Sequence, residues 1–349
     1  MENLEKFYIN GCWVTPNSTE TMPVSNPATE QKIGLITLGN GTDVDRAVTA
    51  ALTAFEEFSQ TSKAQRLSLL LRLKSVTEAR FEDLAQAMRL EMGAPISMAR
   101  SDQADAAVGH LQGFIDALEK LEEQITLASG DVLVREPIGV CGLITPWNWP
   151  MNQIVLKVVP ALATGSCCIL KPSEHTPISA MIYAEIIDEA GFPPGVFNLV
   201  NGDGPTVGAA LSRHADIQMM SFTGSTRAGI AVTQDAAPTV KRVTLELGGK
   251  SPNLVFADCD LENQITASVQ ECMFNSGQSC DAPTRLLVER ACYDQALDIA
   301  KRAGEATLVD SPEKEGDHIG PLFDKIQFDR VQAMISAGID EGATLLVGG

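Results

Sequence analysis

Between residues 140 and 247 the chain alternates short apolar runs with longer amphipathic stretches. The apolar runs have the length of buried strands, and the stretches between them repeat apolar residues at helical spacing. This alternation predicts a doubly wound α/β domain, whose parallel sheet has helices on both faces and binds ligands at the carboxyl ends of its strands. The expected strands are 140–145, 167–173, 196–202, 219–224 and 243–247, and the expected helices are 151–165, 176–191, 205–214 and 225–236.

The flanking segments predict further elements. Residues 43–93 favour two amphipathic helices and residues 98–123 a third, whereas QITLASGDVLVRE (124–136) changes to a two-residue period around a Ser-Gly-Asp turn. That change is typical of a β-hairpin, and a projecting hairpin often meets a partner subunit. Beyond Gly249 we expect a second α/β unit with helices over 264–274 and 293–305, and with strands over 285–289 and 343–349.

One helix start has its own signal. Thr176 followed by Pro177 is typical of an N-cap with proline in the first turn. We therefore expect the second helix of the β/α series to begin there.

Composition excludes several classes of protein. The formal charge of -19 over 349 residues disfavours a nucleic-acid ligand, because phosphate binding needs clustered Lys and Arg. No apolar run reaches the roughly 20 residues of a membrane span, and the first residues lack the layout of a secretory signal. None of the eight cysteines forms a C-x-x-C pair and the four histidines are scattered. We expect reduced thiols, buried Cys167 and Cys168, no metal site and a cytoplasmic protein.

Two motifs follow the first two strands of the β/α series. In Pro146-Trp147-Asn148-Trp149-Pro150 the prolines restrict the backbone around an amide that can donate to an oxyanion. Taken alone, a turn with packed tryptophans explains this motif better. In Lys171-Pro172-Ser173-Glu174 a cation and a carboxylate could hold a ribose, and the carboxylate would repel a 2′-phosphate. A solvated ion pair before a helix is an equally good reading of that motif alone.

Two more motifs follow the later strands. Residues 222–229 (FTGSTRAG) run from a strand through a glycine turn into a helix, whose N-terminal N–H groups suit a pyrophosphate. The G-x-G-x-x-G fingerprint is missing, so this turn alone is weak evidence. Glu246 in LELGGKSP and Cys280 in FNSGQSC offer a base and a nucleophile. Most cysteines are structural, and spacing alone would not single out Cys280.

Taken together and in this order, PWNWP, KPSE, FTGST, LELGGKSP and FNSGQSC resemble the aldehyde dehydrogenase superfamily from the N-terminal helices to the last residue. The resemblance implies that Cys280 attacks the aldehyde and that Asn148 and the Cys280 N–H hold the oxyanion. It also implies that Glu246 activates water to hydrolyse the thioester. NAD is the implied cofactor, with NADP as a possible substitute. The implied cofactor-binding residues are Ile144, Thr145, Pro146, Trp147, Lys171, Ser173, Glu174, Gly204, Phe222, Thr223, Gly224, Ser225, Gly229 and Leu247.

The same resemblance divides the chain into three parts: a dinucleotide-binding domain (1–115 and 137–247), an oligomerisation hairpin (116–136) and a catalytic domain (248–349). In the family a downstream Glu-x-Phe-Gly-Pro motif holds the nicotinamide ribose, and the chain stops before it. We therefore expect a truncated catalytic domain with poor turnover, and a homodimer or homotetramer if the missing part is supplied. Asp281 directly follows the nucleophile and should raise the pKa of Cys280.

Three alternatives stay open at this stage. An acylating relative would pass the thioester to coenzyme A, which Glu246 argues against because hydrolysis needs that base. A truncated relative could bind NAD without turnover, or the chain could keep the fold as a non-catalytic binding protein. Aliphatic aldehydes, aromatic aldehydes and semialdehydes all stay open as substrates, and a semialdehyde-specific or NADP-using dehydrogenase is a further alternative.

Overall fold

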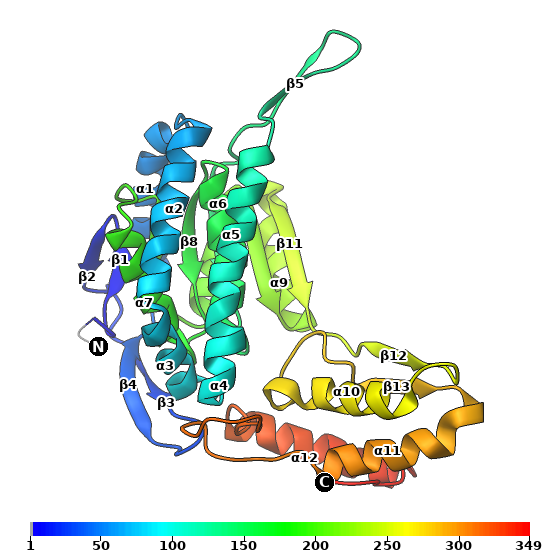
Figure 1. The fold of residues 1–349 in the computed structure, drawn as a ribbon. Helices are drawn as coiled ribbons and strands as arrows, with labels where there is room; N and C mark the ends of the chain where they lie inside the picture. Colours follow the sequence, from blue (N-terminus) through cyan, green and yellow to red (C-terminus); the bar gives the residue numbers. More distant parts are fainter. Residues whose placement is uncertain (1–2) are drawn as a thin grey trace.

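The computed structural model describes residues 3–349, and a seven-stranded sheet forms its centre (Figure 1). Five strands are parallel and adjacent, in the order β11, β10, β7, β8, β9. Their bounds are Val140–Ile144 (β7), Cys167–Lys171 (β8), Phe197–Leu199 (β9), Met219–Gly224 (β10) and Arg242–Leu247 (β11). Every residue of β7, β8 and β9 is buried, as expected for strands covered on both faces. The predicted doubly wound α/β fold is confirmed.

Helices cover both faces of this sheet. One face carries α1 (Gly41–Phe58), α8 (Ala209–Arg213) and α9 (Thr226–Ala236), and α1 packs on β7, β8 and β9. The helices α6 (Pro150–Ala163) and α7 (Pro177–Glu189) cover the other face. An outer layer packs on these two, and it consists of α2 (Lys63–Ala79), α3 (Phe81–Glu91), α4 (Ile96–Met98), the π-helix η1 (Ala99–Ala104) and α5 (Asp105–Lys120).

The N-terminal segment adds strands that the sequence pattern did not predict. β1 (Phe7–Ile9) pairs antiparallel with β9, and β2 (Cys12–Val14) extends the edge beyond it. A separate ribbon joins β3 (Thr21–Ser25) to β4 (Lys32–Thr37). Three-residue strands are too short to show a two-residue period, which explains the omission of β1 and β2.

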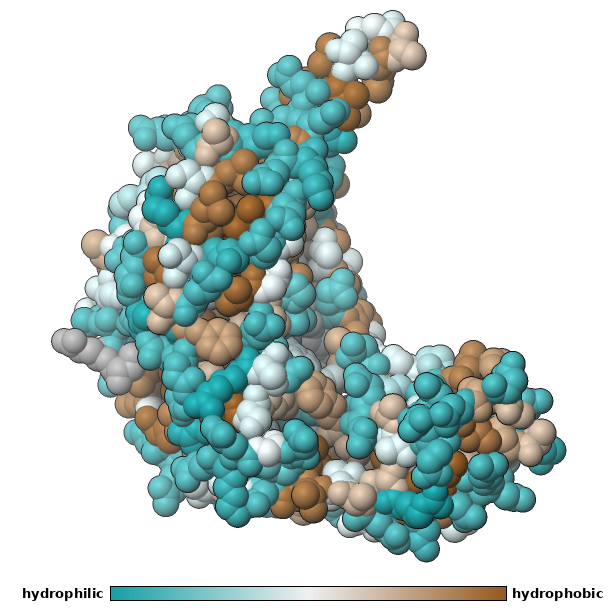
Figure 2. Space-filling view, viewed as in Figure 1, coloured by the Kyte–Doolittle hydropathy of each residue, from teal (hydrophilic) through white to brown (hydrophobic). Residues whose placement is uncertain are grey.

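A hairpin of β5 (Gln124–Thr126) and β6 (Val132–Val134) projects from the helical layer, as expected (Figure 1). Apolar side chains gather along it on the visible face in Figure 2. Val132 is 55% exposed and Val134 is 51% exposed, so the hairpin contributes nothing to the core of its own chain. Such an exposed apolar strand is suited to contact with another protein surface.

The second unit is built on a two-stranded parallel sheet of β12 (Pro252–Val255) and β13 (Arg285–Val288). Its helices are α10 (Leu261–Met273), α11 (Tyr293–Glu305) and α12 (Lys325–Asp340). The second hydrophobic core is small and centres on Val255, Ile265, Ala296 and Ile299. α12 has no buried residue, so it contributes little to that core.

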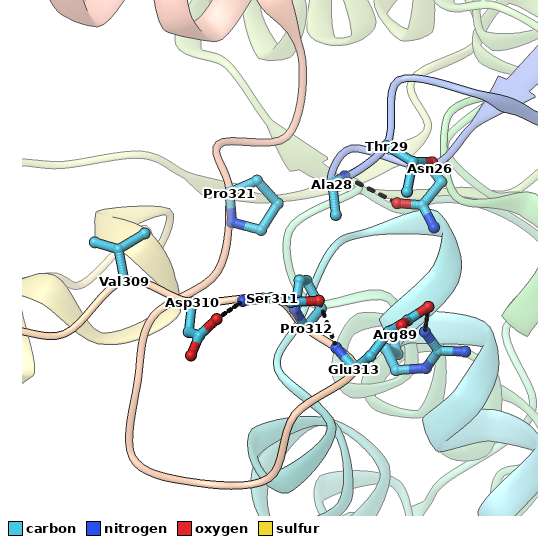
Figure 3. A pocket seen from close by; sticks show the side chains of 10 residues that line it. All are labelled: Asn26, Ala28, Thr29, Arg89, Val309, Asp310, Ser311, Pro312, Glu313 and Pro321. Atoms are coloured by element: carbon cyan, nitrogen blue, oxygen red, sulfur yellow. Dashed lines mark hydrogen bonds and ion pairs between the residues drawn. The ribbon is translucent and has the colours of Figure 1, made fainter.

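Residues 309–323 return from the second unit to the outer helical layer. The Ile96 N–H donates to the Pro312 carbonyl at 2.9 Å, and the Arg89 guanidinium lies 3.5 Å from the Glu313 carboxylate. Figure 3 shows this junction, where Arg89 and Glu313 line a pocket of about 310 Å³. The two units are therefore in contact here, in addition to being linked by the chain segment through Gly249 that connects β11 to β12.

Three sequence expectations are wrong in detail. Residues 43–93 form three helices rather than two, because the chain breaks at Arg80, which ends α2 and starts α3. The expected long helix over 98–123 contains a π-helical turn before α5. The expected strand over 343–349 is absent from the described residues, and Val347 packs near Gly304 instead.

The start of α7 also differs from the expectation. Thr176 occupies the N-cap position, but its side chain makes no capping hydrogen bond. The Glu91 carboxylate accepts the N–H groups of Ile178 at 2.5 Å and Ser179 at 2.9 Å instead. A carboxylate from α3 therefore satisfies the helix start, and burial raises its pKa to about 7.

Cys167 and Cys168 are fully buried, as expected, and burial raises the pKa of both thiols. Within residues 3–349, the structure contains no helix both long and apolar enough to cross a membrane.

Candidate active site

The predicted motifs lie side by side at one edge of the sheet because the strands are in register. Lys171 pairs with Ile144, and Ile144 pairs with Phe222 on the other side. One residue further along β10, Thr223 pairs with Glu246. Residues of three motifs, and the strand end that directly precedes PWNWP, therefore meet at the carboxyl edge of four adjacent parallel strands, where open α/β sheets bind ligands.

A cavity of about 320 Å³ opens at this edge, between the sheet and the second unit. Its wall includes Cys280 and Asn148, together with Leu247 at the end of β11 and Gly248 directly after it. The remaining lining residues are Pro146, Trp147, Trp149, Gln153, Thr223, Gly224, Ser225, Ser276, Gly277, Gln278, Ser279, Leu322, Gln327 and Val331. Four of the five motifs thus contribute more than one residue to the cavity, and only KPSE contributes none.

Cys280 is held beside the end of β11 by a backbone contact. The Gly249 N–H donates to the Cys280 carbonyl at 3.2 Å, which brings the loop after Glu246 against the nucleophile candidate. Burial raises the pKa of the Cys280 thiol, and the negative charges of Asp281 and Glu246 raise it further. The expected effect of Asp281 is therefore present, and the charge of Glu246 acts on the Cys280 pKa in the same direction.

The tryptophan loop is fixed to the segment that precedes Cys280. The Asn148 side-chain Nδ2 donates to the Gln278 carbonyl at 2.8 Å, and Trp149 Nε1 donates to Ser279 Oγ at 2.9 Å. These bonds join residues 130 positions apart, so Asn148 and Cys280 border the same cavity. The second hydrogen of the Asn148 amide can serve another acceptor.

The turn before Cys280 has an unusual backbone. Asn275 (φ 52°), Ser276 (φ 57°) and Gly277 (φ 73°) lie consecutively in the left-handed region. Non-glycine residues rarely adopt that region, and such conformations gather at functional sites. The Ser276 hydroxyl donates to the Gly320 carbonyl at 2.9 Å, so residues 309–323 help to hold the turn.

Lys171 and Glu174 form the ion pair that the sequence suggested. Lys171 Nζ lies 3.1 Å from the Glu174 carboxylate and also donates to the carbonyls of Gly202 at 2.7 Å and Pro172 at 2.9 Å. Lys171 is almost fully buried, whereas the side chain of Glu174 is 22% exposed. A ribose hydroxyl could thus reach the carboxylate while Lys171 fixes its position.

The start of α9 fits a pyrophosphate. Ser225 is its N-cap, and the hydroxyl accepts the Ala228 N–H at 3.2 Å, which leaves earlier N–H groups of the helix for a ligand. A Cβ on Gly224 would lie 2.6 Å from the Phe222 ring, and one on Gly229 would lie 2.9 Å from Leu247. Both glycines therefore allow close packing at this edge. With the Glu174 carboxylate, these features fit a dinucleotide.

Most of the other predicted cofactor residues lie beneath this edge. Ile144, Thr145, Ser173 and Phe222 are buried and do not line the cavity, whereas Thr223 is buried and does line it. The Thr145 N–H donates to the Lys171 carbonyl at 3.2 Å and ties two of the motif loops together. Gly204 begins the π-helix η2 (Gly204–Gly208), where a Cβ would meet no atom within 4 Å.

Sequence reasoning missed a polar row between α6 and β10. Lys157 Nζ donates to Ser221 Oγ at 3.0 Å, and Thr223 Oγ1 donates to Gln153 Oε1 at 2.9 Å. Lys157 is 6% exposed, and burial lowers its pKa to about 8 although the charge of Glu246 opposes that shift. The available signal was a single charged residue inside the apolar run IVLKVV.

The second unit also contributes residues that no motif indicated. The Phe323 ring stacks on Trp147 with centroids 4.3 Å apart and an interplanar angle of 18°. Leu322, Gln327 and Val331 line the cavity that contains Cys280. They come from residues 309–323 and from α12, where no local sequence pattern points to a site.

Comparisons with known proteins agree with this geometry. The model of the aldehyde dehydrogenase family matches residues 13–349. The chain is 49% identical to a 3-succinoylsemialdehyde-pyridine dehydrogenase of a Pseudomonas species, covering 100% of this chain and 73% of that protein. The structure of an aldehyde dehydrogenase from Bartonella henselae has a TM-score of 0.97 and 49% identity, covering 99% of this chain and 73% of that one.

A third comparison includes ligands. A Cys-to-Ala variant of aldehyde dehydrogenase C from Pseudomonas syringae, solved with NAD⁺ and octanal, has a TM-score of 0.98 and 48% identity. It covers 100% of this chain and 72% of that chain. The fold, the cavity at the strand edge and the match over residues 13–349 lead to one conclusion: the chain belongs to the aldehyde dehydrogenase family.

Proposed function

We propose that this chain oxidises an aldehyde to the carboxylic acid with NAD, using Cys280 as nucleophile, Asn148 as oxyanion donor and Glu246 as base. The observation that carries the proposal is the shared cavity of Cys280 and Asn148, bordered by the loop that follows Glu246. The coenzyme A alternative is disfavoured, because Glu246 can supply the base that hydrolysis of the thioester needs.

The proposed reaction begins when the Cys280 thiolate attacks the aldehyde carbonyl carbon and forms a thiohemiacetal. The free N–H of the Asn148 amide and the Cys280 backbone N–H stabilise the oxygen that becomes negative. NAD, when bound, supplies the hydride acceptor that turns this adduct into a thioester. Glu246 then takes a proton from water, and the water oxygen attacks the thioester carbon. The acid leaves and the Cys280 sulfur is released.

We propose that NAD binds along the carboxyl edge of the sheet. Glu174 would accept the adenosine ribose hydroxyls, and the start of α9 at Gly224 and Ser225 would receive the pyrophosphate. The partly exposed carboxylate of Glu174 supports NAD over NADP, because it would repel a 2′-phosphate. Ile144, Thr145, Pro146 and Trp147 would form the floor of the cleft.

We propose an uncharged aliphatic aldehyde as the substrate class. Asp281 and Glu246 both place negative charge near the Cys280 thiol, which disfavours a substrate that carries its own carboxylate. Octanal is bound to the Pseudomonas syringae relative, and its chain is uncharged. We therefore propose the general aldehyde-oxidising class rather than an enzyme confined to semialdehydes.

We further propose the division into a dinucleotide-binding domain (1–115 and 137–247), a hairpin (116–136) and a catalytic domain (248–349). The separate sheets and separate hydrophobic cores support it. The exposed apolar residues of the hairpin support a homodimer or homotetramer built through it. The buried, reduced Cys167 and Cys168 suit the cytoplasm, which we propose as the location.

NADH formation tests the proposal. The protein is mixed with NAD and octanal, and absorbance is followed for the wild type, for Cys280→Ala and for Cys272→Ala as a matched control. We expect NADH from the wild type and the control and none from Cys280→Ala. Turnover that survives Cys280→Ala would overturn the role of Cys280. A folded wild type that binds NAD but forms no NADH would favour a binding protein without turnover.

A further inference from the structure

The oxyanion donor proposed above depends on the main chain of Asn148. Its side-chain amide donates one hydrogen to the Gln278 carbonyl at 2.8 Å, so only the other hydrogen can reach a substrate oxygen. A donor must lie within hydrogen-bond distance of the developing oxyanion to be effective. The direction of that remaining N–H depends on the bond to Gln278 and on the position of the backbone that carries the side chain.

Two buried amide side chains hold that backbone. Gln103 Nε2 donates to the Asn148 carbonyl oxygen at 3.1 Å, and Asn275 Nδ2 donates to the same oxygen at 3.0 Å. Gln103 is 0% exposed and Asn275 is 3% exposed, so water does not compete for these bonds. A carbonyl oxygen has two lone pairs, and both are occupied here.

The two donors come from opposite sides of the site. Gln103 lies in the π-helix η1, in the outer layer of the first unit. Asn275 lies in the left-handed turn five residues before Cys280. π-helical turns and left-handed residues other than glycine are both uncommon, and both gather at functional sites. Each unit therefore supplies one donor to the Asn148 carbonyl, and each donor lies in a stretch of uncommon backbone conformation.

Both amides leave a polar atom without a partner. Gln103 Oε1 and Asn275 Oδ1 are buried and make no hydrogen bond within residues 3–349. An unsatisfied buried acceptor destabilises the folded state, and an apolar side chain of similar size would avoid that cost. The amides are thus poor choices for packing alone. Their N–H groups, both directed at the Asn148 carbonyl, provide a reason for their presence.

We propose that Gln103 and Asn275 are positioning residues. By donating hydrogen bonds to the Asn148 carbonyl oxygen, they orient the Asn148 side-chain amide toward the oxyanion. The inference rests on the proposed function, since it assigns a partner to the Asn148 role. Asn275 Nδ2 also lies 3.3 Å from the Gln278 carbonyl, the acceptor of the Asn148 side chain. The two residues therefore fix the backbone and the side chain of Asn148 relative to Cys280.

The test compares two reactions of Cys280. Acylation by p-nitrophenyl acetate passes through an oxyanion, whereas alkylation by iodoacetamide needs the thiolate but forms no oxyanion. Both rates are followed on the intact protein by mass spectrometry. The variants are Gln103→Met, which keeps the length of the side chain and removes the donor, and Gln112→Met as an exposed control with the same chemical change.

We expect Gln103→Met to slow acylation about 10-fold or more, less than the roughly 10²-fold or greater loss for a deleted oxyanion donor such as Asn148→Ala. The alkylation rate should stay within about twofold of the wild type, and Gln112→Met should not differ from the wild type. Because Gln103 acts through Asn148, the double variant Gln103→Met/Asn148→Ala should acylate at the rate of Asn148→Ala.

Several results would overturn the inference. These are acylation of Gln103→Met at the wild-type rate, an equal loss of alkylation, or a full additional loss in the Asn148→Ala background. Should Gln103→Met fail to fold, Gln103→Glu takes its place. Its neutral carboxyl group can donate to the carbonyl, so acylation divided by alkylation should recover as the pH falls. A flat ratio would refute the role.

The proposed function fails in distinguishable ways. If Cys280 of the wild type is not acylated, both the role of Cys280 as nucleophile and the inference are refuted. If Asn148→Ala is acylated at the normal rate, only the role of Asn148 as oxyanion donor and the positioning roles of Gln103 and Asn275 are refuted. Normal acylation by Gln103→Met with slow acylation by Asn148→Ala would leave the proposed function intact and refute the inference alone.

Discussion

Lys157→Met should stabilise the folded protein near neutral pH. The Lys157 ammonium is buried between α6 and β10, and burial lowers its pKa from 10.5 to about 8. A shift of one pKa unit corresponds to about 1.4 kcal/mol. Relative to the unfolded chain, the folded state therefore disfavours the charged form of Lys157 by about 3 kcal/mol. Methionine has similar length and no charge. The substitution also removes the hydrogen bond from Lys157 to Ser221, which costs about 1 kcal/mol. We therefore expect the free energy of unfolding to rise by about 2 kcal/mol at pH 7.

The gain should depend on pH in a defined direction. Between pH 8 and 10.5 the unfolded chain keeps the Lys157 proton and the folded chain releases it, so wild-type stability from this group rises with pH. The penalty that Lys157→Met removes is therefore complete below pH 8 and disappears above pH 10.5. At pH 9.5 we expect the advantage of the variant to fall to within about 0.5 kcal/mol.

Urea unfolding followed by circular dichroism at pH 7 and pH 9.5 measures both values. Lys120→Met is the matched control, because Lys120 is exposed at the end of α5 and its replacement should change stability by less than about 0.5 kcal/mol. An advantage of Lys157→Met that is equal at the two pH values, or a loss of stability at pH 7, would refute the assignment of a buried charge.

Three further substitutions test separate parts of the site. Asp281→Asn removes a negative charge that raises the Cys280 pKa. The rate of iodoacetamide alkylation should therefore rise at neutral pH, and its pH profile should move to lower pH. An unmoved profile would show that the Asp281 charge does not raise the Cys280 pKa. Glu174→Ser removes the carboxylate that would repel a 2′-phosphate, so the ratio of kcat/KM for NADP to that for NAD should rise about 10-fold or more; an unchanged ratio would place the ribose elsewhere. Phe323→Ala removes the stack on Trp147, which contributes about 1 kcal/mol. Limited proteolysis within residues 309–323 should therefore become about fivefold faster. Equal cleavage rates would show that the stack does not order this segment.

The sequence predicted the sheet and the site edge because both depend on local patterns. Each buried strand is a short apolar run, and each motif follows a strand directly, so parallel pairing alone brings Lys171, Thr223 and Glu246 to one edge. The α7 start at Thr176 was located correctly, but its cap comes from Glu91, which is 85 residues earlier. Contacts over such sequence distances leave no local pattern.

The same reason explains what the sequence did not predict at the site. Gln103 is an ordinary residue of a helical stretch, and only the π-helical turn and the fold bring it to the Asn148 carbonyl. Phe323 stacks on Trp147 across 176 positions of sequence. Lys157 was visible as a charge in an apolar helix, yet the helix period alone does not show which strand it faces.

The most direct test of the mechanism is a single-turnover measurement on Glu246→Gln. The variant is mixed rapidly with NAD and octanal, NADH is followed, and the quenched protein is digested and examined by mass spectrometry. The account predicts a burst approaching one NADH per active site, followed by slow release, with the acyl group attached to the peptide that contains Cys280. Steady turnover at the wild-type rate, or an acyl group on any other residue, would contradict it.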